Sequence, residues 1–358
     1  MAYTTIDNPE LFFQTKLYSG TGSSQSVTLD GDENMQPDWV WGKGRTLSGY
    51  NHGIVDSVRG VSKLIYSNLT DAEDTYSTGI TSLNTDGFTT GSGNVFNNGS
   101  NTYVAWNWKA GTSFTNDASS TSVGTIDSTG SVNTDAGFSI ISYTGNGNSN
   151  QTVAHGLGST VDMVIVKDRD RAGEHWVIYH KSLGKDKYIL FNTDAAGSSS
   201  DYFGTSTPNS TVFGLKTGNT SNNWSGDKFI AYCFASKKGY SKVGSYLGNA
   251  NANGTFVYCG FRPAWVMIKR DGSGENWTIR DNKRDGIGNV VATKALKPNT
   301  NDADGTGDGS EFNMDLLSNG FKLRAASGHS NSSGQTNIFM AFAESPFVNS
   351  KGVPNNAR

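Results

Sequence analysis

The sequence predicts an all-β protein built from three tandem β-sandwich units of the jelly-roll or Greek-key kind. Three observations lead to this prediction. One pair of strands recurs three times along the 358 residues, helical periodicity is almost absent, and Gly, Asn and Ser are abundant between the strands. The repeat carries the most weight, because an overlooked repeat misassigns the whole fold.

The first strand of the recurring pair is apolar and ends in a lysine. Its copies are Pro37–Lys43, Val161–Lys167 and Pro263–Lys269. Both faces of these strands are apolar, so we expect each to be central in a sandwich or packed against a neighbouring unit.

The second strand follows roughly seventy residues later and has the order aromatic, aliphatic, alanine, aromatic. Its copies are Tyr103–Trp106, Phe229–Tyr232 and Phe339–Phe342. Because the two strands always occur together, we expect them to lie side by side in one sheet.

Further blocks match between the copies. Each unit opens with a tyrosine and a glycine turn, beginning at Tyr18, Tyr143 and Tyr246. A second block follows each lysine and aligns three segments: His52–Asp56, His175–Tyr179 and Asn276–Arg280. This alignment makes His52 and His175 equivalent, with Asn276 in the third copy. It also places Asp56, Tyr179 and Arg280 together, which share no chemistry.

The repeat divides the chain into three sandwich units and two connecting or terminal segments. The polar, small-residue stretch 111–136 reads as a linker. The predicted boundaries are 1–110 for the first unit, 137–238 for the second, 239–348 for the third and 349–358 for a C-terminal tail.

Composition argues against several classes of function. The chain has 29 Lys and Arg against 32 Asp and Glu, a net charge of −3, without the basic stripe of a nucleic-acid-binding protein. No apolar run approaches the roughly 20 residues of a membrane span, and residues 1–10 lack the features of a signal peptide. We therefore expect a soluble protein that is not exported by the usual route, with no nucleic-acid partner and no membrane insertion.

Candidate sites are few. The acidic loop at 302–311 is the best candidate for a metal site, with Asp302, Asp304, Asp308 and Glu311 on one segment. It departs from the calcium-loop pattern, because position twelve from Asp302 is Asn313 rather than glutamate. A solvated loop is the alternative, and we predict no metal and no other cofactor.

Catalytic residues are not predicted. The chain has no Gly-x-Ser-x-Gly turn, and neither Cys233 nor Cys259 lies near a histidine in sequence. We expect both cysteines to be buried as small apolar residues, a disulfide being the alternative. A spacing of five residues on a strand directs His175 and His180 to opposite faces, so they cannot readily bind one metal ion together. We therefore expect the histidines to form hydrogen bonds.

Two further groups have structural and functional interpretations. Lys43, Lys167 and Lys269 end apolar strands, where the stem can pack while the ammonium reaches water; a shared ligand contact is the alternative. Trp224 and Tyr202 in polar loops are able to stack on sugar rings, although a core or interface position is commoner for such residues.

With these patterns in place, the chain resembles a family of marine bacteriophage structural proteins, described as tail-fibre or virion proteins with a repeated β-rich domain of unknown function. The likeness covers nearly the whole chain and departs at 348–358, where a shorter tail is expected. The segments that carry it are Asp56–Gly60, Tyr103–Gly111, Asp135–Ile140, Gly260–Lys269 and Ala341–Phe347.

The resemblance implies a non-enzymatic virion protein, a tail fibre or fibre-like appendage that acts in assembly and host attachment. Its expected partners are copies of itself, with a trimer as the usual fibre arrangement, other virion proteins, and a glycan or receptor of the host surface. A capsid decoration or head-fibre protein is the first alternative. A glycan-binding or glycan-cleaving protein of the host surface is an alternative of another class.

Overall fold

A computed structural model describes residues 3–355, except 205, 217, 273, 286–290 and 306–308, and without the side chains of 309 and 310. The prediction of an all-β fold is confirmed. The described chain forms antiparallel sheets with only short helical turns. These turns are η1 (Pro9–Leu11), α1 (Asn94–Asn97), α2 (Ala118–Thr121) and η2 (Gly309–Phe312).

The first unit pairs a six-stranded main sheet with a three-stranded minor sheet. The main sheet has the order β1 (Phe13–Ser19), β9 (Thr102–Trp108), β3 (Trp39–Gly44), β4 (Gly53–Asp56), β5 (Lys63–Tyr66) and β6 (Asp74–Thr75). The minor sheet has the order β2 (Gln25–Val27), β8 (Phe88–Thr90) and β7 (Ile80–Leu83).

The second unit has an eight-stranded main sheet and a two-stranded minor sheet. The main sheet has the order β10 (Thr112–Asn116), β11 (Ser128–Asn133), β12 (Phe138–Thr144), β19 (Lys228–Phe234), β14 (Met163–Asp168), β15 (Val177–His180), β16 (Lys187–Leu190) and β17 (Ser198–Ser199). The minor sheet joins β13 (Gln151–Ala154) to β18 (Val212–Leu215).

The third unit is built from two four-stranded sheets. The main sheet has the order β20 (Ser241–Leu247), β27 (Thr336–Pro346), β22 (Phe261–Arg270) and β23 (Thr278–Asp281). The minor sheet has the order β21 (Phe256–Tyr258), β26 (Gly320–Leu323), β25 (Met314–Leu317) and β24 (Val291–Ala292).

The closing strand of each unit lies between the opening strand and the lysine-ended strand. β9 pairs with β1 and β3, β19 with β12 and β14, and β27 with β20 and β22. The side-by-side placement of the two repeated strands, predicted from their joint recurrence, is therefore confirmed. Bringing the last strand of a unit between two early strands gives each main sheet its Greek-key character.

The prediction of a linker at 111–136 is wrong. This segment forms β10, α2 and β11, and β11 pairs along its length with β12, so that it extends the main sheet of the second unit. Small polar residues misled the prediction because an edge hairpin exposed to water needs little apolar surface, whereas its stability comes from backbone pairing.

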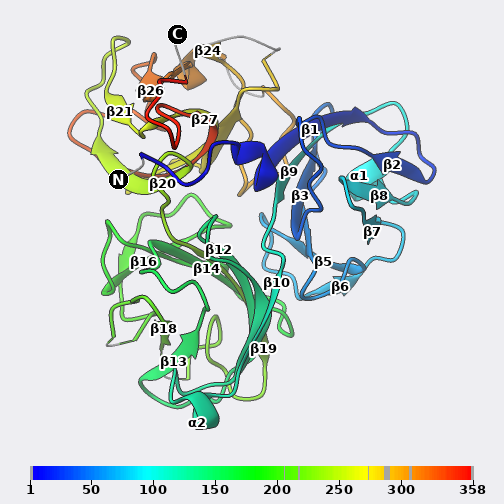
Figure 1. Ribbon diagram of the computed structural model, residues 1–358, viewed down its shortest axis with the longest axis vertical. Helices are drawn as coiled ribbons and strands as arrows, with labels where there is room; N and C mark the ends of the chain where they lie inside the picture. The colour runs from blue at the N-terminus through cyan, green and yellow to red at the C-terminus, as the bar shows by residue number, and fades with distance from the viewer. Residues whose placement is uncertain are drawn as a thin grey trace.

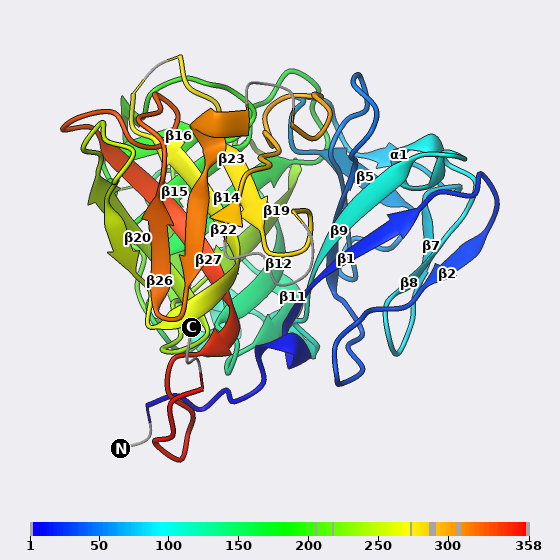
Figure 2. The ribbon, with the colours of Figure 1, turned by 90° about the horizontal axis from the view of Figure 1, so that it is seen from above.

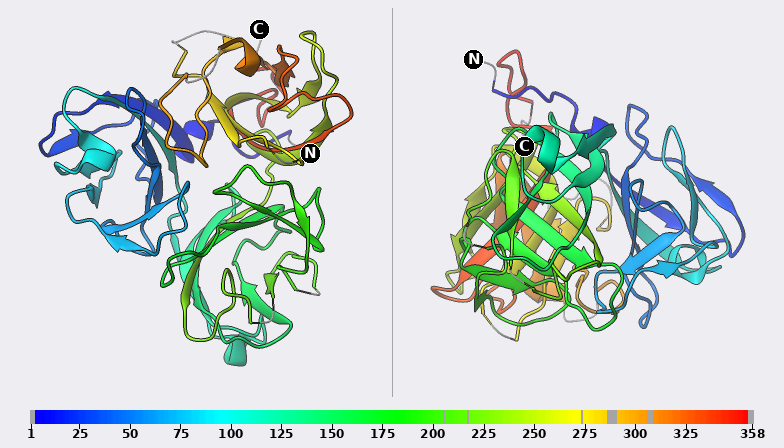
Figure 3. Two further views of the ribbon diagram at one scale, coloured as in Figure 1. Left: turned by 180° about the vertical axis from the view of Figure 1, so that it is seen from behind. Right: turned by 90° about the horizontal axis from the view of Figure 1, so that it is seen from below.

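The three units are arranged around a common centre, with each main sheet facing inward (Figure 1) and the same order visible from behind (Figure 3). Alternate residues of the central strands point to opposite faces. On β3, Trp39 and Trp41 face the centre of the molecule, whereas Val40 faces the minor sheet of its own unit. The strands are apolar on both faces because one face contributes side chains to the central core and the other to the core of its own sandwich.

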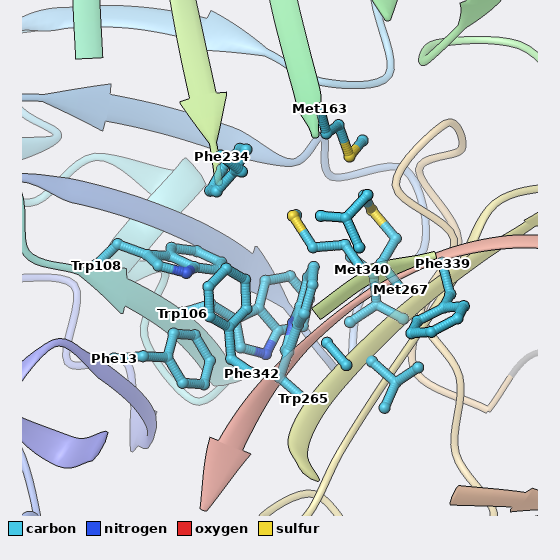
Figure 4. Packing of buried hydrophobic residues seen from close by; sticks show 14 of the residues in the cluster. Phe13, Trp106, Trp108, Met163, Phe234, Trp265, Met267, Phe339, Met340 and Phe342 are labelled. Carbon is cyan, nitrogen blue, oxygen red and sulfur yellow. The ribbon is translucent and has the colours of Figure 1, made fainter. Parts of the chain in front are cut away.

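The central core is rich in aromatic side chains from all three units (Figure 4). Seven of the eight tryptophans belong to it, and the ring of Trp39 lies 4.4 Å from that of Trp108 in its own unit and 4.5 Å from that of Tyr232 in the second. The third unit contributes Trp265, whose ring lies 5.5 Å from that of Trp108. The sandwiches are therefore one body with a shared interior. No helix in the described part of the chain is long and apolar enough to cross a membrane.

Candidate functional site

The most distinctive chemistry of the molecule lies where neighbouring units meet. There, the last residue of the strand that follows the lysine-ended strand (β4, β15 or β23) approaches the closing strand of the next unit. Strand register identifies these residues, because Trp39 pairs with Asp56, Met163 with His180 and Trp265 with Asp281. The alignment drawn from sequence is thus one residue out of register, and Asp56, His180 and Asp281 are the equivalent positions.

The corrected register also changes which residues of the other two units are equivalent to His52. Its true counterparts are Trp176 and Trp277, and all three side chains are buried in the central core. His52 accepts a hydrogen bond from the indole Nε1 of Trp41 at 3.2 Å. Burial lowers the pKa of His52 well below its ordinary value, and the nearby cations Lys43 and Arg284 act in the same direction. Its ring is therefore neutral near pH 7.

The interface between the first and second units holds a buried ion network. Asp56 binds Nε of Arg59 at 2.6 Å with both side chains fully buried, and its Oδ2 also accepts a hydrogen bond from the hydroxyl of Tyr232 at 2.7 Å. Arg59 reaches Glu73 at 3.2 Å, and Glu73 in turn binds Arg169 of the second unit at 2.8 Å. Positive and negative groups alternate along this network, so their attraction offsets part of the free-energy cost of removing each ion from water.

The interface between the third and first units repeats this arrangement with other residues. Asp281 binds Nε of Arg284 at 2.6 Å and accepts a hydrogen bond from the indole Nε1 of Trp106 at 3.1 Å. Asp304 bridges Arg284 at 2.8 Å and Arg45 of the first unit at 3.0 Å. Tyr232 and Trp106 occupy equivalent positions on the closing strands, and each supplies a hydrogen-bond donor to an aspartate of the neighbouring unit.

The interface between the second and third units differs in a consistent way. Phe342 is the aromatic counterpart of Tyr232 and Trp106, and it has no donor to offer. His180 replaces the aspartate, Leu183 replaces the arginine, and His180 Nε2 lies 3.4 Å from the carbonyl of Phe339. The outer ion pair is reversed in sign, because Lys187 of the second unit binds Asp271 of the third at 2.5 Å.

These contacts close a ring in which each unit binds the next through the same positions but with different chemistry. At two interfaces, an aspartate paired with an arginine faces an aromatic residue of the closing strand that donates a hydrogen bond. At the third interface, a histidine and a leucine take these two positions and face phenylalanine, which has no donor. A copy of the second unit placed at another interface would leave a buried charge or donor unpaired, at a cost of about 1–3 kcal/mol or more. The network therefore specifies the order of the units.

The three repeated lysines are fully buried, so the expectation that their ammonium groups reach water is wrong. Each Nζ donates to the carbonyl of the next residue: Lys43 to Gly44 at 3.0 Å, Lys167 to Asp168 at 2.8 Å and Lys269 to Arg270 at 2.7 Å. Burial lowers the pKa of each lysine to about 8, and nearby carboxylates offset only part of that effect.

This burial predicts an unusual pH dependence of stability. Between about pH 8 and 10.5 the unfolded chain holds protons that the folded chain has lost, so the free energy of unfolding rises with pH. Each lysine is expected to contribute about 1 kcal/mol per pH unit up to about pH 9.5, where tyrosine ionisation begins to oppose it. Urea unfolding across this range measures the slope.

Lys167→Met is expected to reduce that slope by about one third, since one of three equivalent groups is lost. Lys351→Met, at an exposed position, serves as the control and is expected to leave the slope unchanged. A slope that is flat in the wild type, or that is equally steep in Lys167→Met, would contradict the proposed desolvation of these lysines.

The acidic loop does not gather its carboxylates. Asp302 lies 3.5 Å from Lys297, Asp304 serves the ion network described above, and Glu311 lies 3.7 Å from the ring of His329. Asp308 lies outside the described residues. Among those that are described, no group of three metal-ligating side chains is close enough to hold an ion. The loop instead contributes Asp304 to the packing of the third unit against the first.

Both cysteines and three of the five histidines, His52, His155 and His180, are buried. Cys233 and Cys259 are free and buried, as predicted. His155 lies 3.1 Å from the carbonyl of Asn209, and burial lowers its pKa to about 4. Burial also lowers the pKa of His180 to about 4.

The two loop aromatics differ in environment. Trp224 is 38% exposed, and the guanidinium of Arg171 lies 4.8 Å from its ring. Tyr202 stacks on Tyr188 with ring centroids 3.9 Å apart. Trp224 is the more accessible of the two.

Sequence reasoning missed a repeated asparagine that holds the glycine turn of each unit. Oδ1 of Asn97 accepts the backbone N–H of Thr21 at 2.7 Å, Asn223 that of Asn146 at 3.1 Å, and Asn331 that of Asn249 at 2.9 Å. Each of these asparagines also donates to two carbonyls. The available signal was an asparagine six to eight positions before each closing strand.

A depression on the surface of the second unit has a volume of about 610 Å³. Hydroxyl groups dominate its lining, with Asp127 as its one carboxylate and Lys228 as its one cation. Two carboxyl groups at a suitable separation are the usual requirement for glycoside hydrolysis. This depression has the chemistry of a polar surface groove.

Comparison with known proteins places the chain in one family. The model of a family described as a domain of unknown function, DUF7483, matches residues 8–346 and so spans all three sandwich units. The chain belongs to this family. No curated protein and no solved structure matches it.

Proposed function

We propose that the protein is a non-enzymatic structural component of a virion, a tail fibre or fibre-like appendage that assembles with copies of itself and with other virion proteins. The resemblance to phage structural proteins motivates the proposal. The physical observation that supports it best is the closed ring of units, fastened by one central core and by ion networks at two interfaces.

Such a ring suits a part that must keep its shape under load, because no unit can swing without breaking buried contacts with both neighbours. The terminal segments support attachment at one end. They leave the same end of the molecule (Figure 2), where Asp7 accepts hydrogen bonds from the backbone and hydroxyl of Ser350. The loops at the opposite end are then free for a host surface.

The test is electron microscopy of purified particles with a gold-labelled antibody against the chain. We expect the gold label on the tail. We also expect quantitative mass spectrometry to find a few dozen copies of the protein or fewer per particle. Hundreds of copies on the shell would assign the protein to capsid decoration instead. Absence from purified particles, or release of reducing sugar from host polysaccharide by the isolated protein, would overturn the proposal.

A further inference from the structure

Each sandwich has an edge formed by the opening strand of its main sheet and the outer strand of its minor sheet. This edge is covered to different extents in the three units. In the second unit, residues 112–133 cover this edge. Strand β11 pairs with β12 of the main sheet, and the connection that precedes β11 reaches β13 of the minor sheet. The backbone N–H groups of Thr125 and Ile126 donate to the carbonyl of Thr152, at 2.9 and 3.2 Å. Ile126 is buried beside Val153 in the core of the unit.

The equivalent edge of the third unit is open in its middle. Toward its ends, the backbone N–H of Val243 donates to Oγ of Ser236 at 3.0 Å, and the carbonyl of Leu247 accepts a hydrogen bond from Oγ1 of Thr255 at 2.8 Å. The edge consists of β20 and β21, the outer strands of the two sheets, which lie next to each other where Lys242 Nζ donates to the carbonyl of Tyr258. The outward backbone groups of Ser245, which correspond to those of Ser142 in the covered edge, find no partner among the described residues. The same is true of Phe256, the counterpart of Thr152.

The open edge is also unusually apolar. Of the exposed large apolar side chains in the described chain, three lie on these two strands: Leu247 at 60%, Tyr258 at 48% and Phe256 at 43%. In the first unit the counterparts of Phe256 and Tyr258 are Ser26 and Thr28. An open edge with exposed aromatic residues is a liability unless something covers it.

Charge indicates what covers it. Three lysines surround the edge. Lys242 lies 5.5 Å from the ring of Tyr258, and Lys322 pairs in register with Phe256. Lys238 lies 4.4 Å from the ring of Tyr3, whose hydroxyl is 3.0 Å from that of Tyr258. Within the described residues none of the three has a carboxylate within 4.0 Å. On the first unit, by contrast, the edge lysine Lys16 is paired with Asp30.

We propose that the β20–β21 edge is a docking site for an extended, acidic segment of another protein, which adds a strand to the third unit as residues 112–133 do to the second. Strand addition supplies backbone hydrogen bonds for affinity and side-chain contacts for specificity. Two copies of this edge pairing with each other would bring like charges together, which disfavours self-association there. The covering segment 112–133 has the expected sign, with Asp117 and Asp127 and no lysine or arginine.

This inference does not depend on a virion location, since the edge is open wherever the protein acts. The test uses the full chain and, as a probe, a fluorescein-labelled peptide with the sequence of residues 112–133. The edge of the second unit is already occupied by the chain itself, and the edge of the first unit has serine and threonine in place of the exposed aromatic residues and a lysine that is already paired. We therefore expect the free peptide to bind the edge of the third unit. Fluorescence anisotropy is expected to show saturable one-to-one binding that weakens as salt is added.

Ser245→Pro removes one outward N–H and leaves the pairing of β20 with β27 intact, so it is expected to weaken peptide binding about tenfold. Ser245→Ala keeps that N–H and is the matched control, expected to bind as the wild type does. Lys322→Glu is an independent variant at the same edge, also expected to lose about tenfold. A peptide with lysine at both aspartate positions is expected to bind more weakly than the native sequence.

Three results would overturn the proposal: no saturable binding to the wild type, equal binding to folded Ser245→Pro or Lys322→Glu, or equal binding of the lysine-substituted peptide. Sedimentation velocity provides the remaining check. If the wild type dimerises and Ser245→Pro is monomeric, the occupant of the edge is a second copy of the chain, and the proposed acidic partner is wrong.

Discussion

Replacing Trp39 with alanine is expected to lower the free energy of unfolding by about 3–5 kcal/mol, the range for deleting a large aromatic side chain from a packed core. The loss is expected to reach beyond the first unit, because the ring of Trp39 stacks on Tyr232 of the second unit at 4.5 Å and lies 5.7 Å from Phe138. Urea unfolding followed by tryptophan fluorescence measures the total change.

Hydrogen exchange read by mass spectrometry shows where that loss is felt. Peptides from β19 in the second unit are expected to lose protection together with those from β9 in the first. Trp224→Ala is the matched control, because this tryptophan is partly exposed and lies outside the central core; it is expected to cost no more than about 0.5 kcal/mol. Protection lost in the first unit alone would show that the units have independent interiors.

Replacing Asp56 with alanine is expected to cost about 3–5 kcal/mol, because the variant leaves Arg59 fully buried without its closest carboxylate. Glu73 remains 3.2 Å from Arg59 but already binds Arg169. The hydroxyl of Tyr232 loses its acceptor at the same time. Thermal and urea unfolding both report this change.

A double variant tests whether the cost comes from the stranded charge. Asp56→Ala combined with Arg59→Leu places at the first interface the leucine that the second unit carries as Leu183. The double variant is expected to be more stable than Asp56→Ala alone, since an apolar replacement of both ions is tolerated better than the loss of one. A double variant less stable than the single one would show that the cost of Asp56→Ala does not come from the buried charge of Arg59.

The repeat made much of the fold predictable from sequence. The run of apolar residues on both faces of strands such as Val161–Lys167 indicated strands buried on both sides, and the joint recurrence of two strands indicated their pairing. Both inferences follow from local geometry, because the side chains of a strand alternate and the strands of a repeated unit keep their neighbours.

Other features depended on contacts that no local pattern specifies. The register of Asp56, His180 and Asp281 was misaligned by one residue because matching blocks by composition placed His52 with His175, and a shift of one residue exchanges the two faces of a strand. The buried lysines were expected to reach solvent because a sequence shows the stem and the charge but not the neighbouring unit that covers them.

The hairpin at 112–133 resembled a linker because its few apolar side chains are enough for an edge, where backbone pairing carries the stability. The ion networks were hidden for a different reason. Arg59 and Glu73 lie in the first unit and Arg169 in the second, and only the packing of complete units brings them within 3.2 Å. Long-range polar contacts of this kind require the assembled fold.

The most direct test of the shared core is differential scanning calorimetry of the full chain. If the three units have one interior, the protein unfolds in a single transition whose calorimetric enthalpy equals the van't Hoff enthalpy. Two or three separable transitions, or a calorimetric enthalpy several times the van't Hoff value, would show that the sandwiches unfold independently and would contradict the account.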